Sequence, residues 1–221
     1  MDQTFSNAIA FILEGDTEKV FYLNMIKHFC EQHSDWSFSR IVDVNNNEIN
    51  YCVITPASRV LIKMYVVGTI SSMVNAHGWF FNRCFSVNKG LNWTVFLCYD
   101  TDNYSEDITK FYEGDWDELR KQLRKGKRTT IIDLASSADI EDTMLLDSEG
   151  VFKFLAIDPI PIPNGSKGKT KMKKIFRTKG PRSAYHEGTR AESLIEALNM
   201  STIINLSPIP FSEIEKALGN Q

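Results

Sequence analysis

The sequence predicts an α/β protein with a mostly parallel sheet flanked by helices. Short apolar segments alternate along the chain with longer segments in which apolar residues recur at helical spacing. Continuously apolar strands are typical of a parallel sheet that helices cover on both faces. The chain has 221 residues, 43% of them hydrophobic, which is enough for one domain with a core of its own.

Four segments have the composition of strands. Residues 8–13 and 94–99 are nearly uninterrupted apolar runs, as expected for central strands of a covered sheet. Residues 36–44 alternate between apolar and polar side chains, and residues 129–134 are alternating and rich in β-branched residues. Their alternation with helical segments favours a sheet built from β-α-β units.

Helices are expected between these strands, because apolar residues recur there near helical period. The first helix follows Asp16, a suitable N-cap, and its apolar pattern fades by His33. Residues 59–76 are expected to form a mostly buried helix. A helix with a polar face is expected at 116–124, and another helix begins in the segment 140–146.

The chain is expected to divide near residue 158. The prolines within residues 159–163 are so closely spaced that neither a helix nor a central strand can pass through them. We therefore expect a main domain over residues 1–158 and a basic, helical extension over residues 159–221 that packs on the same domain. Helices of this extension are expected at about 189–198 and 211–218.

Positive charge is concentrated in residues 165–190. This segment has nine Lys or Arg residues and one acid, a net +8, so the rest of the chain, whose total is −3, stands at −11. Such a segment on an acidic protein is typical of a phosphate-rich partner, although a solvated basic loop gives the same pattern. The candidate nucleic-acid contacts are Lys169, Lys171, Lys173, Lys174, Arg177 and Arg182.

The cysteines and the apolar stretches indicate in which cellular compartment the protein is expected. The four cysteines lie far apart and form no Cys-x-x-Cys pair, which disfavours a zinc site or a disulfide framework and favours a reducing cytoplasm. The N-terminus lacks the basic start of a secretory signal. The longest apolar stretch, residues 60–74, is interrupted by Lys63 and is too short to cross a bilayer. We expect a cytoplasmic protein without a membrane partner.

Carboxylates follow two of the apolar strands. Glu14 comes directly after residues 8–13, and Asp100 and Asp102 follow residues 94–99. In an open α/β sheet ligands bind beyond the carboxyl ends of the strands, where such side chains meet. Glu18 lies one helical turn beyond Glu14 and can face the same crevice. Mg²⁺ prefers hard oxygen ligands of this kind.

Each acid also has a simpler explanation. Glu18 could complement the helix dipole, and Asp100 and Asp102 could belong to an ordinary turn. A third acidic segment, residues 136–142, follows the strand at 129–134. There Asp139 can cap a helix, whereas Glu141 has no capping role and is a candidate ligand, although a glutamate in an exposed first turn is also ordinary. The conjunction favours a site for one or two Mg²⁺ or Mn²⁺ ions, with the candidate ligands Glu14, Glu18, Asp100, Asp102 and Glu141.

These motifs resemble a known family. Residues 13–19, Leu-Glu-Gly-Asp-Thr-Glu-Lys, resemble the EGxTE opening of Toprim-like proteins, and residues 98–103 resemble their hydrophobic DxD strand. The match is closer to small stand-alone Toprim proteins of the RloB type, relatives of the nuclease half of the OLD family. Residues 136–142 resemble the third acidic motif of the OLD nucleases.

The resemblance implies a Rossmann-like Toprim sheet, a divalent metal, and cleavage or rejoining of nucleic-acid backbones. It also implies a setting in bacterial anti-phage defence and a partner ATPase. It assigns catalysis to Glu14, Asp100 and Asp102, together with a later lysine, for which we nominate Lys179. We expect a metal-dependent nuclease, with DNA as the favoured substrate. An RNA- or tRNA-directed nuclease and a non-catalytic nucleic-acid-binding subunit of a defence complex are the alternatives.

Overall fold

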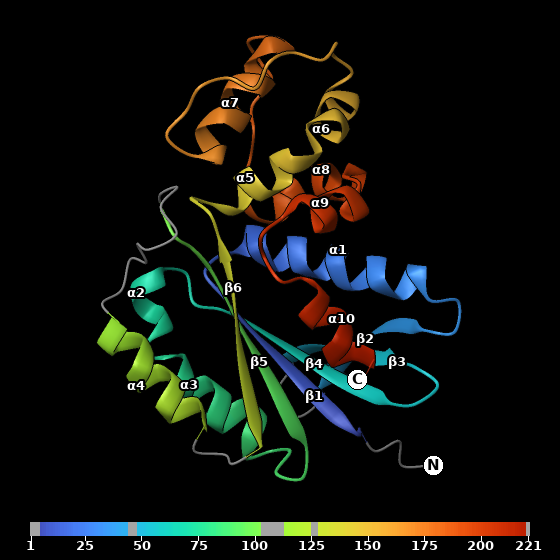
Figure 1. The fold of residues 1–221 in the computed structure, drawn as a ribbon, viewed down its shortest axis with the longest axis vertical. Helices are drawn as coiled ribbons and strands as arrows, with labels where there is room; N and C mark the ends of the chain where they lie inside the picture. The colour runs from blue at the N-terminus through green and yellow to red at the C-terminus, as the bar shows by residue number, and fades with distance from the viewer. Residues whose placement is uncertain (1–4, 44–47, 103–112, 125–127, 220–221) are drawn as a thin grey trace.

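The protein is built on a six-stranded sheet in the order β2-β3-β4-β1-β5-β6 (Figure 1). The computed structural model describes residues 5–43, 48–102, 113–124 and 128–219. The strands are β1 (Asn7–Leu13), β2 (Ser37–Asp43), β3 (Glu48–Ile54), β4 (Arg59–Val66), β5 (Asn92–Asp100) and β6 (Thr129–Ser136). Strands β4, β1, β5 and β6 are mutually parallel, whereas β3 runs antiparallel to both β2 and β4.

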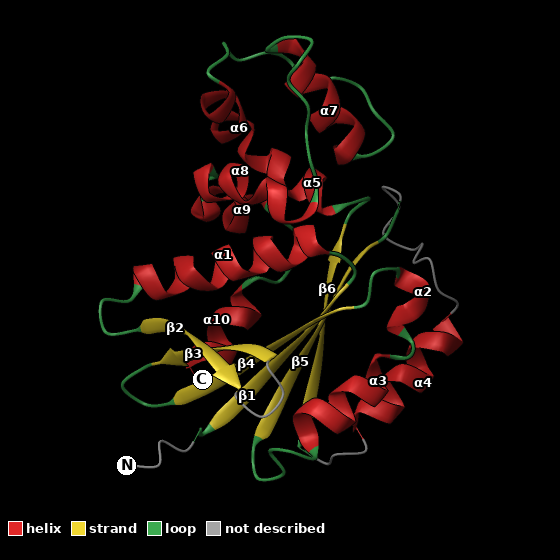
Figure 2. Ribbon diagram, turned by 180° about the vertical axis from the view of Figure 1, so that it is seen from behind, coloured by secondary structure: helices red, strands yellow, loops and turns green. Residues whose placement is uncertain are grey.

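Helices cover both faces of this sheet (Figure 2). On one side lie α2 (Ile70–Met73), α3 (Ala76–Trp79), the π-helix η1 (Phe80–Phe85) and α4 (Glu113–Arg124). On the other lie α1 (Asp16–Gln32) and α10 (Ser212–Gly219). The remaining helices stack beyond α1, past the carboxyl ends of the strands: α5 (Ile140–Met144), η2 (Leu145–Asp147), α6 (Ser148–Leu155), α7 (Gly168–Thr178), η3 (Gly188–Ala191), α8 (Glu192–Ala197) and α9 (Met200–Leu206). The predicted fold class, a mostly parallel α/β sheet flanked by helices, is confirmed.

The central strand β1 shows why its sequence is apolar throughout. Ile9, Phe11 and Leu13 point into the core on the α1 side. Ala8, Ala10 and Ile12 alternate with them and enter the second core, on the α4 side. Both faces of β1 are therefore covered, and all of these side chains are almost completely buried.

The C-terminal part of the chain shares the core of the main sheet. Ile175 of α7 and Ile195 of α8 belong to the same buried cluster as Phe11 of β1. Phe211, just before α10, lies with its ring centroid 5.9 Å from that of Phe21 in α1. Residues on both sides of the proline-rich segment 159–163 thus bury one continuous apolar surface.

The helix predicted at residues 59–76 is wrong. Residues 59–66 form β4, and only the short helices α2 and α3 follow. The strand lies between β1 and β3, so consecutive residues such as Val60, Leu61 and Ile62 are all buried, which imitates a buried helix. The side chain of Lys63 is buried in the same strand and donates to the carbonyl oxygen of Arg83 at 2.7 Å.

The other predicted elements appear with shifted ends. The N-cap of α1 is Gly15, and Asp16 is the first helical residue, which corrects the predicted cap. The strand predicted at 36–44 is β2, and residue 44 lies outside the described residues. Strand β3 and helices α6, α7 and α9 were not expected. In the part of the chain that the structure describes, no helix has the length and hydropathy needed to cross a membrane.

Candidate metal centre

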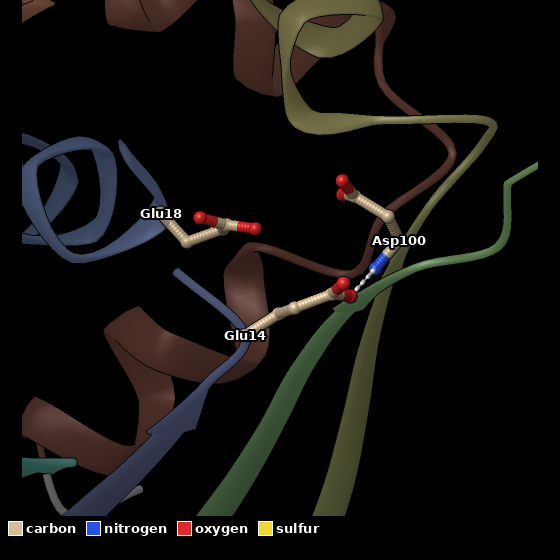
Figure 3. Close-up of side chains that lie close together, drawn as sticks. All are labelled: Glu14, Glu18 and Asp100. Carbon is tan, nitrogen blue, oxygen red and sulfur yellow. Dashed lines mark hydrogen bonds between the residues drawn. The ribbon is translucent and has the colours of Figure 1, made fainter. Parts of the chain in front are cut away.

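The first two acids meet because β1 and β5 are parallel neighbours. Leu13 lies opposite Cys98 in the ladder, so both strands end at the same edge of the sheet. The backbone N–H of Glu14 donates to the carbonyl oxygen of Cys98 at 3.1 Å and extends the ladder by one residue. The N–H of Asp100 in turn donates to Oε2 of Glu14 at 3.3 Å, which fixes that carboxylate beside Asp100 (Figure 3).

Glu18 completes the group from the first turn of α1. Its side chain folds back over Gly15, where an added Cβ would lie 2.8 Å from Oε2 of Glu18. Only 5% of Glu18 is exposed. Figure 3 shows the carboxylates of Glu14, Glu18 and Asp100 pointing toward one another.

These three carboxylates have the geometry of a cation site. One oxygen atom of each lies within 4.8 Å of the other two. Ligand oxygens lie about 2.1 Å from an octahedral Mg²⁺, hence about 3 Å apart when adjacent and about 4.2 Å apart across the ion. The carboxylates of Glu14, Glu18 and Asp100 face a common space and would draw closer together on binding an ion.

The electrostatics of the group also fit a cation. Burial, followed by the charges of Glu18 and Glu14, raises the pKa of Asp100 to about 9. Burial and the charge of Glu14 likewise raise the pKa of Glu18 to about 7. Among the described residues, Oδ1 of Asp100 is buried without a hydrogen-bond partner. A hard divalent cation would give this unpartnered oxygen an ion to coordinate, and its positive charge would allow the acids to ionise.

A further acid faces the same cleft from the end of β6. Asp139 caps α5 by accepting from the N–H of Asp142 at 3.0 Å, as predicted. Glu141 is 4% exposed, and its Oε1 accepts a hydrogen bond of 2.8 Å from the hydroxyl of Tyr185. Burial and the charge of Asp139 raise the pKa of Glu141 to about 7. Glu141 therefore lines the cleft beside the three-carboxylate group without belonging to it.

Asp102 is held differently from Asp100. Its φ of 65° is left-handed, and its N–H donates to the carbonyl oxygen of Ala138 at 2.9 Å. Ala138 itself has a φ of 61°, so two non-glycine residues adopt a strained conformation where the ends of β5 and β6 interlock. The carboxylate of Asp102 forms an ion pair with Lys167. The structure thus places this predicted ligand in the cleft, paired with a lysine and outside the three-carboxylate group.

The N-terminus of α7 closes the cleft. Gly168 donates its N–H to Oδ2 of Asp142 at 2.7 Å, and Lys169 donates its N–H to Oδ2 of Asp139 at 3.0 Å. A Cβ at Gly168 would lie 2.1 Å from the backbone nitrogen of Asp142, so only glycine permits this approach. The contact brings Lys167 and Lys169 to the rim of a cleft of about 500 Å³ that the acids line.

Several of the predicted nucleic-acid contacts are engaged within the protein. Lys169 and Lys173 lie 2.5 and 3.7 Å from carboxylate oxygens of Glu187. Lys171 lies 2.7 Å from Oδ1 of Asp142, and 19% of its side chain is exposed, so it is not the free surface lysine that we expected. The ammonium of Lys174 donates to a carbonyl oxygen of the neighbouring loop, and Arg177 and Arg182 are exposed.

The nominated catalytic lysine does not reach the cleft. Lys179 is exposed and caps the C-terminal end of α7, whereas the cleft lies at the N-terminal end. The intervening helix of 11 residues is about 16 Å long. The structure instead brings Lys167 to the acids, a residue that sequence reasoning did not single out. Tyr185 was also missed, because nothing in the sequence around it indicates that its hydroxyl meets Glu141.

Comparisons with known proteins do not assign the chain to a family. No family model matches the chain, and no curated protein matches it. Among solved structures, a similarity was found to 5′-methylthioadenosine/S-adenosyl homocysteine nucleosidase from Campylobacter jejuni, with 10% sequence identity, 99% of this chain and 100% of that chain covered, and a TM-score of 0.31. At this TM-score the similarity carries no inference about fold or activity.

Proposed function

We propose that this protein is a Mg²⁺- or Mn²⁺-dependent nuclease that cleaves nucleic-acid phosphodiester bonds. One observation carries the proposal: three carboxylates converge at the carboxyl edge of a parallel sheet, and one buried oxygen of Asp100 has no hydrogen-bond partner within the described residues. Ligands of open α/β sheets bind at this edge. The lysines at the rim of the same cleft suit a phosphate group.

Glu14, Glu18 and Asp100 are the residues that would hold the ion. A bound divalent ion polarises a phosphoryl oxygen and lowers the pKa of water, which is the chemistry that phosphodiester hydrolysis needs. Lys167 and Lys169 stand opposite the acids, where they can orient the substrate phosphate by charge. Their pairing with Asp102 and Glu187 neutralises them until a phosphate competes for their ammonium groups.

Glu141 is placed to move a proton. Its pKa of about 7 is close to physiological pH, where a carboxylate can both accept a proton and release it. The hydrogen bond from Tyr185 occupies Oε1 of Glu141 and fixes the orientation of the carboxylate. We assign Glu141 to accepting a proton from the attacking water, or to a second ion if two are bound.

The biological setting is proposed from the motifs alone. The resemblance of residues 13–19 and 98–103 to Toprim proteins of the RloB type supports a role in bacterial anti-phage defence with a partner ATPase. DNA is the favoured substrate on the same basis, and structured RNA such as tRNA is the alternative within the same chemistry.

The experiment that tests the proposal is incubation of the purified chain with plasmid, linear DNA and tRNA, each in Mg²⁺, Mn²⁺ or EDTA. We expect cleavage of at least one substrate in a metal ion, none in EDTA, and none by Asp100→Asn. Tight binding of nucleic acid without metal-dependent turnover on any substrate would contradict a nuclease and support a non-catalytic subunit. The substrate panel separates DNA cleavage from RNA cleavage.

A further inference from the structure

A second cavity is connected to the acidic cleft through Tyr185. It has a volume of about 260 Å³ and is bounded by α6, α7, α8 and the segment that leads into α8. Phe154 of α6, Phe176 of α7 and Tyr185 form its aromatic side, and His186 and Arg190 contribute its polar side. We call this cavity the aromatic pocket.

The aromatic pocket presents a ring to solvent. Phe154 is 37% exposed, although its α6 neighbours Val151, Phe152 and Leu155 are buried. Its ring centroid lies 6.4 Å from that of Phe176, which in turn lies 5.5 Å from the ring of Tyr185. Phe176 and Tyr185 are nearly buried, so they support the exposed ring from behind.

Three arginines of the basic segment form no ion pair within the described residues. Lysines near the N-terminus of α7 are instead paired with carboxylates, as the ion pairs of Lys167, Lys171 and Lys173 show. Further along the chain, Arg177, Arg182 and Arg190 are exposed and form no ion pair within the described residues. Of these arginines, Arg190 lines the aromatic pocket, and Arg177 is the chain neighbour of Phe176, which also lines it.

The pocket and the cleft share one side chain. The ring of Tyr185 lines the aromatic pocket, while its hydroxyl donates to Glu141 in the cleft. A nucleic-acid strand whose phosphate lay in the cleft would thus have a neighbouring nucleotide within reach of the pocket.

We propose that the aromatic pocket binds one unpaired nucleobase of a single-stranded nucleic acid, stacked on Phe154, with the flanking phosphates held by the arginines. This inference rests on the proposed nuclease function for its link to the cleft. A base inside a duplex is already stacked on its neighbours and cannot enter such a pocket, whereas an unpaired base stacks readily on an aromatic ring. The preferred ligand is therefore single-stranded DNA or RNA, or a strand with a looped-out base.

The test measures binding without cleavage, by fluorescence anisotropy in EDTA. The probes are labelled single strands of DNA or RNA about 12 nucleotides long, their duplexes, and an abasic strand with the same phosphates. We expect the strand with bases to bind at least about fivefold more tightly than the abasic strand. Phe154→Ala should remove this difference, and Phe154→Trp should retain it. Comparison of the DNA and RNA arms identifies the natural sugar.

Phe81→Ala is the matched control, because Phe81 is 55% exposed but belongs to η1. It should bind every probe as the unmodified protein does. Undiminished discrimination by Phe154→Ala, or binding of none of the probes, would overturn the pocket. If Phe154 is needed for the discrimination but no metal-dependent cleavage is found, the base-binding pocket is supported and the nuclease function is contradicted. If cleavage is found without this discrimination, the nuclease function is supported and the base-binding pocket is contradicted.

Discussion

The hydroxyl of Tyr185 donates a hydrogen bond of 2.8 Å to Glu141, across 44 residues of chain. Tyr185 belongs to the basic C-terminal part, and Glu141 follows the last strand of the sheet. A second hydrogen bond also joins the C-terminal part to the main sheet domain: the N–H of Gly188 donates to Oγ1 of Thr17, in α1, at 2.7 Å. The C-terminal part therefore forms one wall of the acidic cleft.

Tyr185→Phe removes this hydrogen bond and keeps the ring. Because the bond lowers the pKa of Glu141, its loss should raise that pKa further. We expect the acid limb of the pH–rate profile to move to higher pH, and stability to fall by about 1 kcal/mol. A pH–rate profile that matches that of the unmodified protein would show that Glu141 does not titrate in the reaction.

Asp100→Asn should leave the metal-free protein as stable as before, or more stable. The substitution replaces an acid that the folded protein must keep protonated, although the same side chain ionises in the unfolded chain, as the raised pKa of Asp100 indicates. It should also abolish the rise in melting temperature that Mg²⁺ produces in the unmodified protein. Loss of the native fold, measured by circular dichroism, would instead give Asp100 a structural role.

The stability of the metal-free protein should fall as pH rises from about 4 to about 9. The folded pKa of Asp100 is about 9 against 3.8 for the free side chain, and those of Glu18 and Glu141 are about 7 against 4.5. The folded state therefore binds more protons than the unfolded state across this range, and raising the pH favours unfolding.

Melting temperatures in EDTA, measured across this range, check that prediction. Addition of Mg²⁺ should flatten the dependence on pH, because an ion offsets the repulsion among the ionised carboxylates. The Asp100→Asn variant should show a smaller decline than the unmodified protein. A melting temperature in EDTA that rises toward pH 9 would contradict the raised pKa values.

Gly168→Ala should destabilise the protein by roughly 2 kcal/mol or more, because its Cβ would lie 2.1 Å from the backbone nitrogen of Asp142. Either α7 separates from α5 or the cap that Asp139 and Asp142 provide is lost. Gly78→Ala is the control, since no atom lies within 4 Å of its added Cβ. Equal free energies of unfolding for the two variants, from urea titrations, would refute the close approach.

Arg177→Gln combined with Arg182→Gln should weaken binding to all nucleic-acid sequences and leave the fold intact. For each phosphate that an arginine no longer neutralises, the slope of log affinity against log salt should flatten by about 0.9 on duplex DNA, and by about 0.7 on a single strand. Lys171→Met should differ, because it removes the ion pair between Lys171 and the largely buried Asp142 and therefore lowers stability. A salt slope unchanged in the double variant would place the phosphates elsewhere.

The acids at the strand ends were predictable from sequence. The apolar runs before Glu14 and Asp100 indicate buried strands, and parallel neighbours end at one edge, so the meeting of these two residues follows from local pattern. The backbone at Asp102 was not predictable in the same way. Its left-handed φ depends on a hydrogen bond to Ala138, which is 36 positions away in sequence.

Neither the position of Lys167 in the cleft nor the strand β4 was predictable from sequence, because both depend on tertiary contacts. Lys167 and Lys179 both belong to the basic segment, and nothing in the sequence around them shows which one reaches the acids. The packing of Gly168 against α5 decides which end of α7 meets the acids. In β4, burial on both faces removes the alternation that would distinguish a strand from a helix. Tertiary contacts decide both cases.

The most direct test of the central claim is calorimetric titration of Mn²⁺ into the metal-free protein. We predict saturable binding that Asp100→Asn and Glu18→Gln each abolish, while Asp133→Asn, at a carboxylate paired with Arg120 away from the cleft, binds as the unmodified protein does. Binding that survives in both cleft variants, or no binding at all by the unmodified protein, would contradict a metal centre formed by Glu14, Glu18 and Asp100.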